Sequence, residues 1–211
     1  MKIISVNIGA AREIEWQGEK ILTGIFKQPT SEPLKVSFLN IKGDEQADPR
    51  VHGGKDKAVY SYDVSYYAHW KNVLDRNDWS YGMFGENLTT EGLPDTEVRI
   101  GNIYRIGSVL LQAVEPRFPC FKLNARFGLS NMTKLFWEQK RNGTYFRVLE
   151  EGFIEKVYSI RLVEESKYDV TIENMVDAYQ TRGADKCLLK KILEIEGLPE
   201  RTHENFLSLA D

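Results

Sequence analysis

The chain has 211 residues, of which 42% are hydrophobic and 28% are charged, and its net charge at pH 7 is −3. This length and composition are typical of one globular domain, with or without a small appendage, and they exclude a disordered chain. The negative net charge disfavours a general nucleic-acid binder. Two cysteines cannot form the disulfide framework of a secreted protein, and no run approaches the ~18 apolar residues of a membrane span. We therefore expect a cytoplasmic protein that binds neither nucleic acid nor membrane.

Short runs of β-forming residues, each bounded by turn residues, dominate the chain as far as residue 165. They predict strands at 2–9, 23–29, 34–44, 57–63, 86–92, 97–107, 108–116, 144–154 and 157–165. Two stretches change to a helical period, at 64–74 and at 129–143, and Gly143 occupies the position of a C′ glycine that ends the second helix. Many short strands with few helices favour a mainly β fold, a closed or nearly closed β-barrel with a few peripheral helices.

The pattern changes after residue 167. Three amphipathic helix patterns follow, with no strand among them, at 171–180, 184–195 and 199–210. Thr171 is a suitable N-cap for the first of these helices, and Pro199 suits the first turn of the last one. We therefore divide the chain into a β-barrel domain, residues 1–167, and a small C-terminal three-helix domain, residues 168–211.

The segment GDEQADPRVHGGKDKAVYSY, residues 43–62, concentrates positive charge around two adjacent glycines. Because glycine has no Cβ, backbone N–H groups can converge there on a ligand, and cations beside them complete a pocket for an anion such as phosphate. A hydrophilic hairpin loop with solvated charges explains the same pattern. The residues concerned are Arg50, His52, Gly53, Gly54, Lys55 and Lys57.

A second segment, GMFGENLTTEGL at residues 82–93, forms a glycine-bounded turn that leads into a predicted strand. Asn87 lies at the end of this turn, where its side-chain amide is available to donate a hydrogen bond to a polar ligand. A purely structural turn is the alternative interpretation.

The third segment is AVEPRFPCFKLNARFG, residues 113–128, which contains Cys120. Prolines on both sides restrict this loop, and the neighbouring cations Arg117 and Lys122 favour the thiolate, the form of cysteine that attacks electrophiles and binds metals. A small buried residue that fills a gap in the core is the alternative. The other cysteine, Cys187, lies in DKCLLKKIL at helical spacing, where packing is its expected role.

Taken in this order, the segments GDEQADPRVHGGKDKAVYSY, FGENLTTEGL and IGNIYRIGSVLLQAVEPRFPCFKLNARFG resemble the MOSC domain, named for the C-terminal domain of molybdenum cofactor sulfurase. They resemble in particular the stand-alone bacterial subgroup that includes the hydroxylaminopurine-resistance protein. That subgroup carries a C-terminal three-helix domain, which residues 168–211 also resemble, so the resemblance covers nearly the whole chain. It implies a β-barrel fold and a bound molybdenum cofactor.

The resemblance also implies a set of site residues. In the family, the dithiolene of a phosphorylated pyranopterin and one protein cysteine hold the molybdenum, and Cys120 matches that cysteine. The glycine-rich loop would cradle the pterin and its phosphate, while Asn87, Arg117 and Lys122 would lie near the metal. The implied catalytic residues are Cys120, His52 and Asn87, the cofactor-binding residues are Arg50, Gly53, Gly54, Lys55, Arg117 and Lys122, and the metal ligand is Cys120.

The implied activity is the reduction of N-hydroxylated compounds to amines. Small N-hydroxylated bases, hydroxylamines and amidoximes are the implied substrates, and detoxification of N-hydroxylated bases is the implied role. The chain shows no flavin or iron–sulfur motif, so we expect the electrons to come from a separate partner, a flavoprotein reductase. We expect a monomer or a homodimer.

Other functions fit the same residues. The fold could carry the molybdenum cofactor, or sulfur as a persulfide on Cys120, without turnover. Cys120 could act as the nucleophile of a hydrolase or transferase with His52 as its base. Pyridoxal phosphate could bind through Lys55 or Lys57, although this role would leave Cys120 unexplained. A pure interaction module accounts for the strands and helices but not for the basic loop and the thiol together.

Overall fold

The computed structural model describes residues 1–47 and 53–210. Within these residues, the strands form one large mixed sheet and two small sheets of two strands each. The strands in chain order are β1 (Lys2–Ile8), β2 (Arg12–Trp16), β3 (Glu19–Thr23), β4 (Gln28–Thr30), β5 (Leu34–Val36), β6 (Val59–Asp63), β7 (Leu88–Glu91), β8 (Ile103–Ile106), β9 (Val109–Pro116), β10 (Thr144–Glu150), β11 (Gly152–Ile154) and β12 (Ile160–Glu164).

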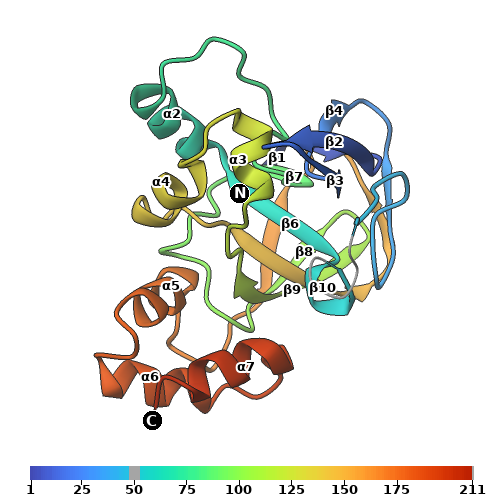
Figure 1. The fold of residues 1–211 in the computed structure, drawn as a ribbon. Coiled ribbons are helices and arrows are strands. Elements are labelled where there is room, and N and C mark those ends of the chain that lie inside the picture. Colours follow the sequence, from blue (N-terminus) through green and yellow to red (C-terminus); the bar gives the residue numbers. More distant parts are fainter. Residues whose placement is uncertain (48–52, 211) are drawn as a thin grey trace.

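The large sheet has the strand order β12-β8-β9-β10-β6-β7-β1-β4. Its neighbours pair in antiparallel fashion except β6 and β7, which are parallel. The helices lie outside the sheet, with α2, α3 and α4 on one side and α5, α6 and α7 gathered at one end of the molecule (Figure 1). They are α2 (Val64–Val73), α3 (Lys122–Phe127), α4 (Met132–Glu138), α5 (Ile172–Gln180), α6 (Lys186–Leu193) and α7 (Glu200–Leu207), with a short 3-10 helix η1 (Lys55–Lys57).

The prediction of a mainly β fold with peripheral helices is confirmed, but closure of the sheet into a barrel is not. The sheet ends at β12 on one side and at β4 on the other. Part of the gap is bridged by backbone hydrogen bonds, because the N–H of Ile3 donates to the carbonyl of Tyr158 (2.9 Å) and the N–H of Ile160 donates to that of Met1 (2.9 Å). The start of β1 is thus tied to the segment that leads into β12.

An aromatic cluster joins α2 and α4 to the sheet. Tyr62 of β6 stacks on Phe84 with 4.5 Å between ring centroids, and Trp70 of α2 stacks on Phe136 of α4 with an interplanar angle of 5°. All four side chains are fully buried. Aromatic rings supply large buried apolar area, so this cluster fixes the helices that stand beside the loop after β9.

The three C-terminal helices form where the sequence predicts them. Thr171 caps α5 as expected, in a reciprocal capping box with Asn174, whereas Pro199 precedes the first turn of α7 as its N-cap. Their apolar residues belong to the same buried cluster as the sheet, including Met175, Ile192 and Phe206. The boundary between residues 167 and 168 remains a prediction.

Among the described residues, no helix has the length and apolar character needed to cross a membrane.

Three local features differ from the sequence-based expectations. The β2–β3 hairpin, with its turn at Gln17 and Gly18 in left-handed conformations, was not predicted, because its alternating charged residues mask the strand pattern. Helix α3 follows Cys120 in a segment expected to be a loop. Gly143 is not a C′ glycine, since α4 ends at Glu138 with Gln139 as its C-cap.

Candidate functional site

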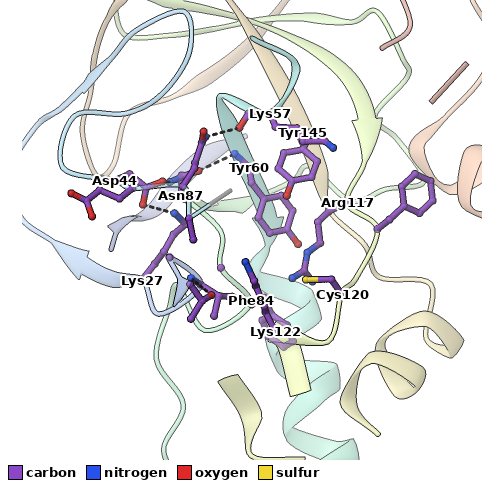
Figure 2. Close-up of a pocket in the computed structure, with 18 residues that line it drawn as sticks. Lys27, Asp44, Lys57, Tyr60, Phe84, Asn87, Arg117, Cys120, Lys122 and Tyr145 are labelled. Atoms are coloured by element: carbon purple, nitrogen blue, oxygen red, sulfur yellow. Dashed lines mark hydrogen bonds and ion pairs between the residues drawn. The ribbon is translucent and has the colours of Figure 1, made fainter. Parts of the chain in front are cut away.

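A pocket opens beside the loop that follows β9, and it encloses about 660 Å³ including its open mouth. Figure 2 shows Lys27, Asp44 and Asn87 on one side of the pocket and Arg117 and Cys120 on the other. The lining residues come from the segment after β3, the loop after β5, η1, β6, the turn before β7, the loop between β9 and α3, the start of α3, and β10.

Cys120 lies between the end of β9 and the start of α3, and its thiol is free and partly exposed. Its carbonyl accepts hydrogen bonds from the N–H of Leu123 (2.9 Å) and from the hydroxyl of Thr133 (3.1 Å). The same hydroxyl is 2.8 Å from the side-chain oxygen of Asn124, which also accepts the N–H of Thr133 (2.6 Å). The start of α4 therefore holds the backbone of the thiol-bearing turn.

Arg117 is only 5% exposed, and it lines the pocket near Cys120 (Figure 2). Its guanidinium carbon lies 5.6 Å from the ring centroid of Tyr60 and 5.0 Å from that of Phe136. Its Nη1 atom has no hydrogen-bond partner among the described residues, and no carboxylate there forms an ion pair with it. A buried cation without an anion is costly, so this side of the pocket can accept a negatively charged ligand.

The backbone of Arg117 is held by a network behind the pocket. Its N–H donates to the carbonyl of Gly143 (3.1 Å), and its carbonyl accepts the side-chain amide of Asn142 (2.8 Å). The buried carboxylate of Asp95 accepts the backbone N–H groups of Asn142 (2.7 Å) and Gly143 (3.0 Å). Burial raises the pKa of Asp95 to about 7, although these N–H groups act in the opposite direction.

The opposite side of the pocket carries a buried ion pair between Lys27 and Asp44. Asp44 also accepts the side-chain amide of Asn87 (3.0 Å) and the backbone N–H of Gly9 (3.0 Å). Burial lowers the pKa of Lys27, although Asp44 and Glu86 favour its charged form. Here, unlike at Arg117, a carboxylate of the chain itself compensates the cation.

Aromatic side chains and another cation, Lys57, also line the pocket walls. Tyr60, Phe84 and Tyr145 line it, and burial raises the pKa of Tyr145 to about 12. Lys57 lies 3.6 Å from the carboxylate of Glu115 and 5.9 Å from the ring centroid of Tyr145. Glu115 also accepts the hydroxyl of Thr202 from α7, and burial raises its pKa. The C-terminal helices therefore contact a residue that supports the pocket.

Of the residues predicted from the sequence, five line this pocket: Lys57, Asn87, Arg117, Cys120 and Lys122. The side-chain nitrogen of Asn87 donates to Asp44 and, at 3.4 Å, to the carbonyl of Asn7, so its amide is already engaged within the protein. The remaining predicted residues are not brought into the described wall: Gly53, Gly54 and Lys55 precede or begin η1 and are not lining residues, while Arg50 and His52 lie outside the described residues.

Sequence reasoning missed Lys27 and Asp44. Lys27 was expected only as part of a strand, because it follows a short β-forming run. Asp44 lies at the start of the segment with the predicted cations, and a carboxylate next to an expected anion pocket could have indicated that one cation is paired. Neither residue carries a motif by itself, so their pairing appears only in the fold.

The donors of this pocket fit a phosphorylated, sulfur-rich cofactor. A thiolate at Cys120 is a soft ligand suited to a sulfur-bound metal. The unpartnered guanidinium nitrogen of Arg117 and the ammonium group of Lys122 suit an anion, because charge-assisted hydrogen bonds to phosphate are strong. The sequence resemblance and the donor chemistry of the pocket therefore agree.

Comparison with known proteins places the chain in a family. Residues 48–160 match the model of the MOSC domain. The YflK protein of Bacillus subtilis is 33% identical over 211 residues, which cover 99% of this chain and 94% of YflK. A Gibberella moniliformis protein described as a reductase is 35% identical over 181 residues, covering 84% of this chain but only 32% of its own length. The crystal structure of YiiM from Geobacillus stearothermophilus has a TM-score of 0.83 at 29% identity, with 99% of this chain and 98% of that chain covered. The chain belongs to the MOSC domain family.

Proposed function

We propose that this MOSC protein is a molybdenum-cofactor-dependent reductase that converts N-hydroxylated compounds to amines. The observation that carries the proposal is the presence, in one pocket, of the free thiol of Cys120 and the buried guanidinium of Arg117, whose Nη1 has no partner among the described residues. A purely structural loop would not need an unsatisfied buried cation beside a thiol. The similarity to a protein described as a reductase supports the same conclusion.

The residues predicted from the sequence have the following roles in this proposal. Cys120 ligates the metal, while Arg117 and Lys122 neutralise negative charge on the cofactor. Asn87 keeps the Asp44 side of the pocket in place, which is a positioning role rather than the direct catalytic role expected from the sequence. The cofactor-binding roles of Arg50, Gly53, Gly54 and Lys55, and the catalytic role of His52, remain part of the proposal.

The reaction is balanced as R–NH–OH + 2 e⁻ + 2 H⁺ → R–NH₂ + H₂O. The cofactor, when bound, supplies the redox chemistry. The protein binds and orients the substrate, excludes water with the rings of Phe84 and Tyr145, and delivers protons. N-hydroxylated bases, hydroxylamines and amidoximes are the substrate class.

The electrons must come from another protein or another domain. The chain matches about a third of the length of the reductase from Gibberella moniliformis, so that protein has additional sequence in which an electron-supplying domain can reside. We propose that here a separate flavoprotein reductase plays this part, in the cytoplasm, where the Cys120 thiol stays reduced.

The decisive experiment is the molybdenum content per chain after expression in a host that makes the cofactor. The wild type is expected to carry near-stoichiometric molybdenum and Cys120→Ser much less. Cys187→Ser is the matched control, because Cys187 is exposed on α6 and does not line the pocket, and it should load like the wild type. Absence of molybdenum from the wild type in such a host would overturn the proposal.

Turnover separates the reductase from a carrier. Loaded protein supplied with a chemically reduced viologen dye should convert 6-hydroxylaminopurine to adenine, and unloaded protein should not. Stoichiometric molybdenum without turnover of bases, hydroxylamines or amidoximes would indicate a carrier of the cofactor. Activity in metal-free protein, with covalent trapping of Cys120, would indicate a cysteine nucleophile instead.

A further inference from the structure

Lys27 is the buried cation that the proposed roles leave unused. It is 7% exposed, and it lines the pocket together with Asp44 and Asn87 (Figure 2). The other pocket lysines, Lys57 and Lys122, are more exposed. A lysine held at a fixed place in a pocket where a reaction consumes protons is a candidate acid.

The backbone at Lys27 is fixed by two glycines. A Cβ on Gly9 would lie 3.1 Å from the Cα of Lys27, and a Cβ on Gly82 would lie 2.9 Å from its carbonyl oxygen. Gly82 also has a φ of 83°, a conformation that favours glycine. Only glycine at these positions lets the two neighbouring segments approach so closely, so the position of Lys27 is set by the fold.

The ammonium group is oriented by Asp44, and Asp44 is oriented in turn. The Asp44 carboxylate accepts hydrogen bonds from the side chain of Asn87 (3.0 Å) and from the N–H of Gly9 (3.0 Å). The carbonyl oxygen of the Asn87 side chain accepts the N–H of Tyr60 (3.1 Å), which ties the amide to β6. Asn87 therefore acts through Asp44 as a positioning residue.

We propose that Lys27, positioned by Asp44 and Asn87, donates a proton to the leaving oxygen of the N-hydroxylated substrate. This inference rests on the proposed function. The N–O bond breaks as two electrons arrive from the external reductant, and the oxygen leaves as water. Lys27 supplies one of the two protons and becomes a neutral amine beside Asp44. Solvent supplies the other proton and later reprotonates Lys27.

The electrostatics of the pocket agree with this role. Burial lowers the pKa of Lys27, which brings a lysine closer to the range where it can give up its proton at physiological pH. Asp44 and Glu86 limit this effect by stabilising the charged form. The other charged or titratable side chains that line the pocket are Glu45, Lys57, Tyr60, Arg117, Cys120, Lys122 and Tyr145.

The test compares Lys27→Met, which removes the acid at similar length, with Lys27→Arg, which keeps the charge but does not release its proton at physiological pH. Lys42→Met is the matched control, because Lys42 is exposed and does not line the pocket. Molybdenum content and turnover of 6-hydroxylaminopurine are measured for the wild type first, and these two values judge the proposed function by themselves.

If Lys27 is the acid, both Lys27 variants lower kcat by about 100-fold or more while molybdenum per chain stays near the wild-type value. The wild type should then show an alkaline limb in its pH profile of kcat that is absent from both Lys27 variants, and Lys42→Met should behave like the wild type. Near-normal kcat in Lys27→Arg would overturn the inference, since charge alone would then suffice. Loss of molybdenum in step with kcat would also overturn it, since Lys27 would then hold the cofactor.

A second readout needs neither turnover nor the cofactor. In wild-type protein with ¹³C-labelled lysine, the Cε signal that is missing from both Lys27 variants reports the titration of Lys27. We expect it to titrate at lower pH than the signals of the exposed lysines, because burial lowers the pKa of Lys27. Titration together with those lysines would refute the proton-donor role even if the protein proves to be a reductase.

Discussion

Each side of the pocket contains a buried cation, Lys27 on one side and Arg117 on the other, but the two charges are compensated differently. Lys27 is buried and forms an ion pair with Asp44, whose carboxylate is further held by Asn87. Arg117 is buried to a similar degree, but it faces the rings of Tyr60 and Phe136 and leaves Nη1 without a partner among the described residues. A carboxylate of the chain compensates the charge of Lys27, whereas Arg117 has no carboxylate partner among the described residues.

This difference indicates how stability and binding are divided between the two sides. A paired buried charge depends on its partner for folding, because removal of that partner leaves an uncompensated ion. An unpaired buried charge lowers the stability of the free protein and adds to the affinity for an anion. Three predictions follow the comparison from its strongest consequence to its weakest.

Asp44→Asn should lower the free energy of unfolding by about 3–5 kcal/mol, because it leaves Lys27 buried without a carboxylate. Urea denaturation at neutral pH measures the loss. The matched control is the double variant Lys27→Met with Asp44→Leu, which removes both charges and should recover most of the stability. A double variant as unstable as Asp44→Asn would show that the ion pair is not the cause.

The free energy of unfolding should depend on pH through Asp95, the buried carboxylate that supports the backbone behind Arg117. Burial raises its pKa in the folded state to about 7, against 3.8 in the unfolded chain. Between these values the folded protein binds more protons than the unfolded chain, so this contribution to stability is complete below about pH 4 and is lost as the pH rises to about 7. The difference amounts to at most about 4 kcal/mol.

The measurement for Asp95 is the free energy of unfolding at several pH values between 4 and 8, for the wild type and for Asp95→Asn. The stability of the wild type relative to the variant should fall as the pH rises through this window and then level off. A constant difference across the window would mean that the Asp95 carboxyl titrates as in the unfolded chain.

Arg117→Met should have the smallest effect on the free protein, a change of less than about 1 kcal/mol in the free energy of unfolding. The variant loses contacts with two rings, but it also removes the desolvation cost of an unpaired cation and keeps an apolar stem. Inorganic phosphate should raise the melting temperature of the wild type but not that of the variant. An equal rise in melting temperature for both proteins would show that phosphate does not bind at Arg117.

Much of the secondary structure follows from local sequence. The period of residues 171–210 predicts three helices, and the structure has them, with Thr171 as the N-cap of α5. The β2–β3 hairpin and the short helix α3 were missed, because charged residues interrupt the strand alternation and because six residues are too few to establish a helical period. The sheet remains open between β12 and β4, and the backbone hydrogen bonds that bridge part of this gap join distant segments that no local pattern encodes.

Some residues of the candidate site could be predicted from local sequence, and others could be found only in the structure. Cys120, Arg117 and Lys122 are close in sequence, so the loop pattern was enough to group them. Asn87 was predicted as a turn residue whose amide donates to a ligand, but in the structure this amide donates to Asp44. Lys27 was not singled out, since a lysine in a strand-like run is ordinary until its burial is known.

The sequence by itself determined the α-helices other than α3, most of the strands and the basic loop with its thiol, because these depend on residues within one or two turns of each other. Only the tertiary structure decided which cations are compensated. Lys27 and Asp44 are 17 positions apart and Asp44 and Asn87 are 43 apart, so their contacts exist only after the sheet brings the three segments together. Arg117 has no carboxylate partner among the described residues, because the same packing surrounds it with aromatic rings instead.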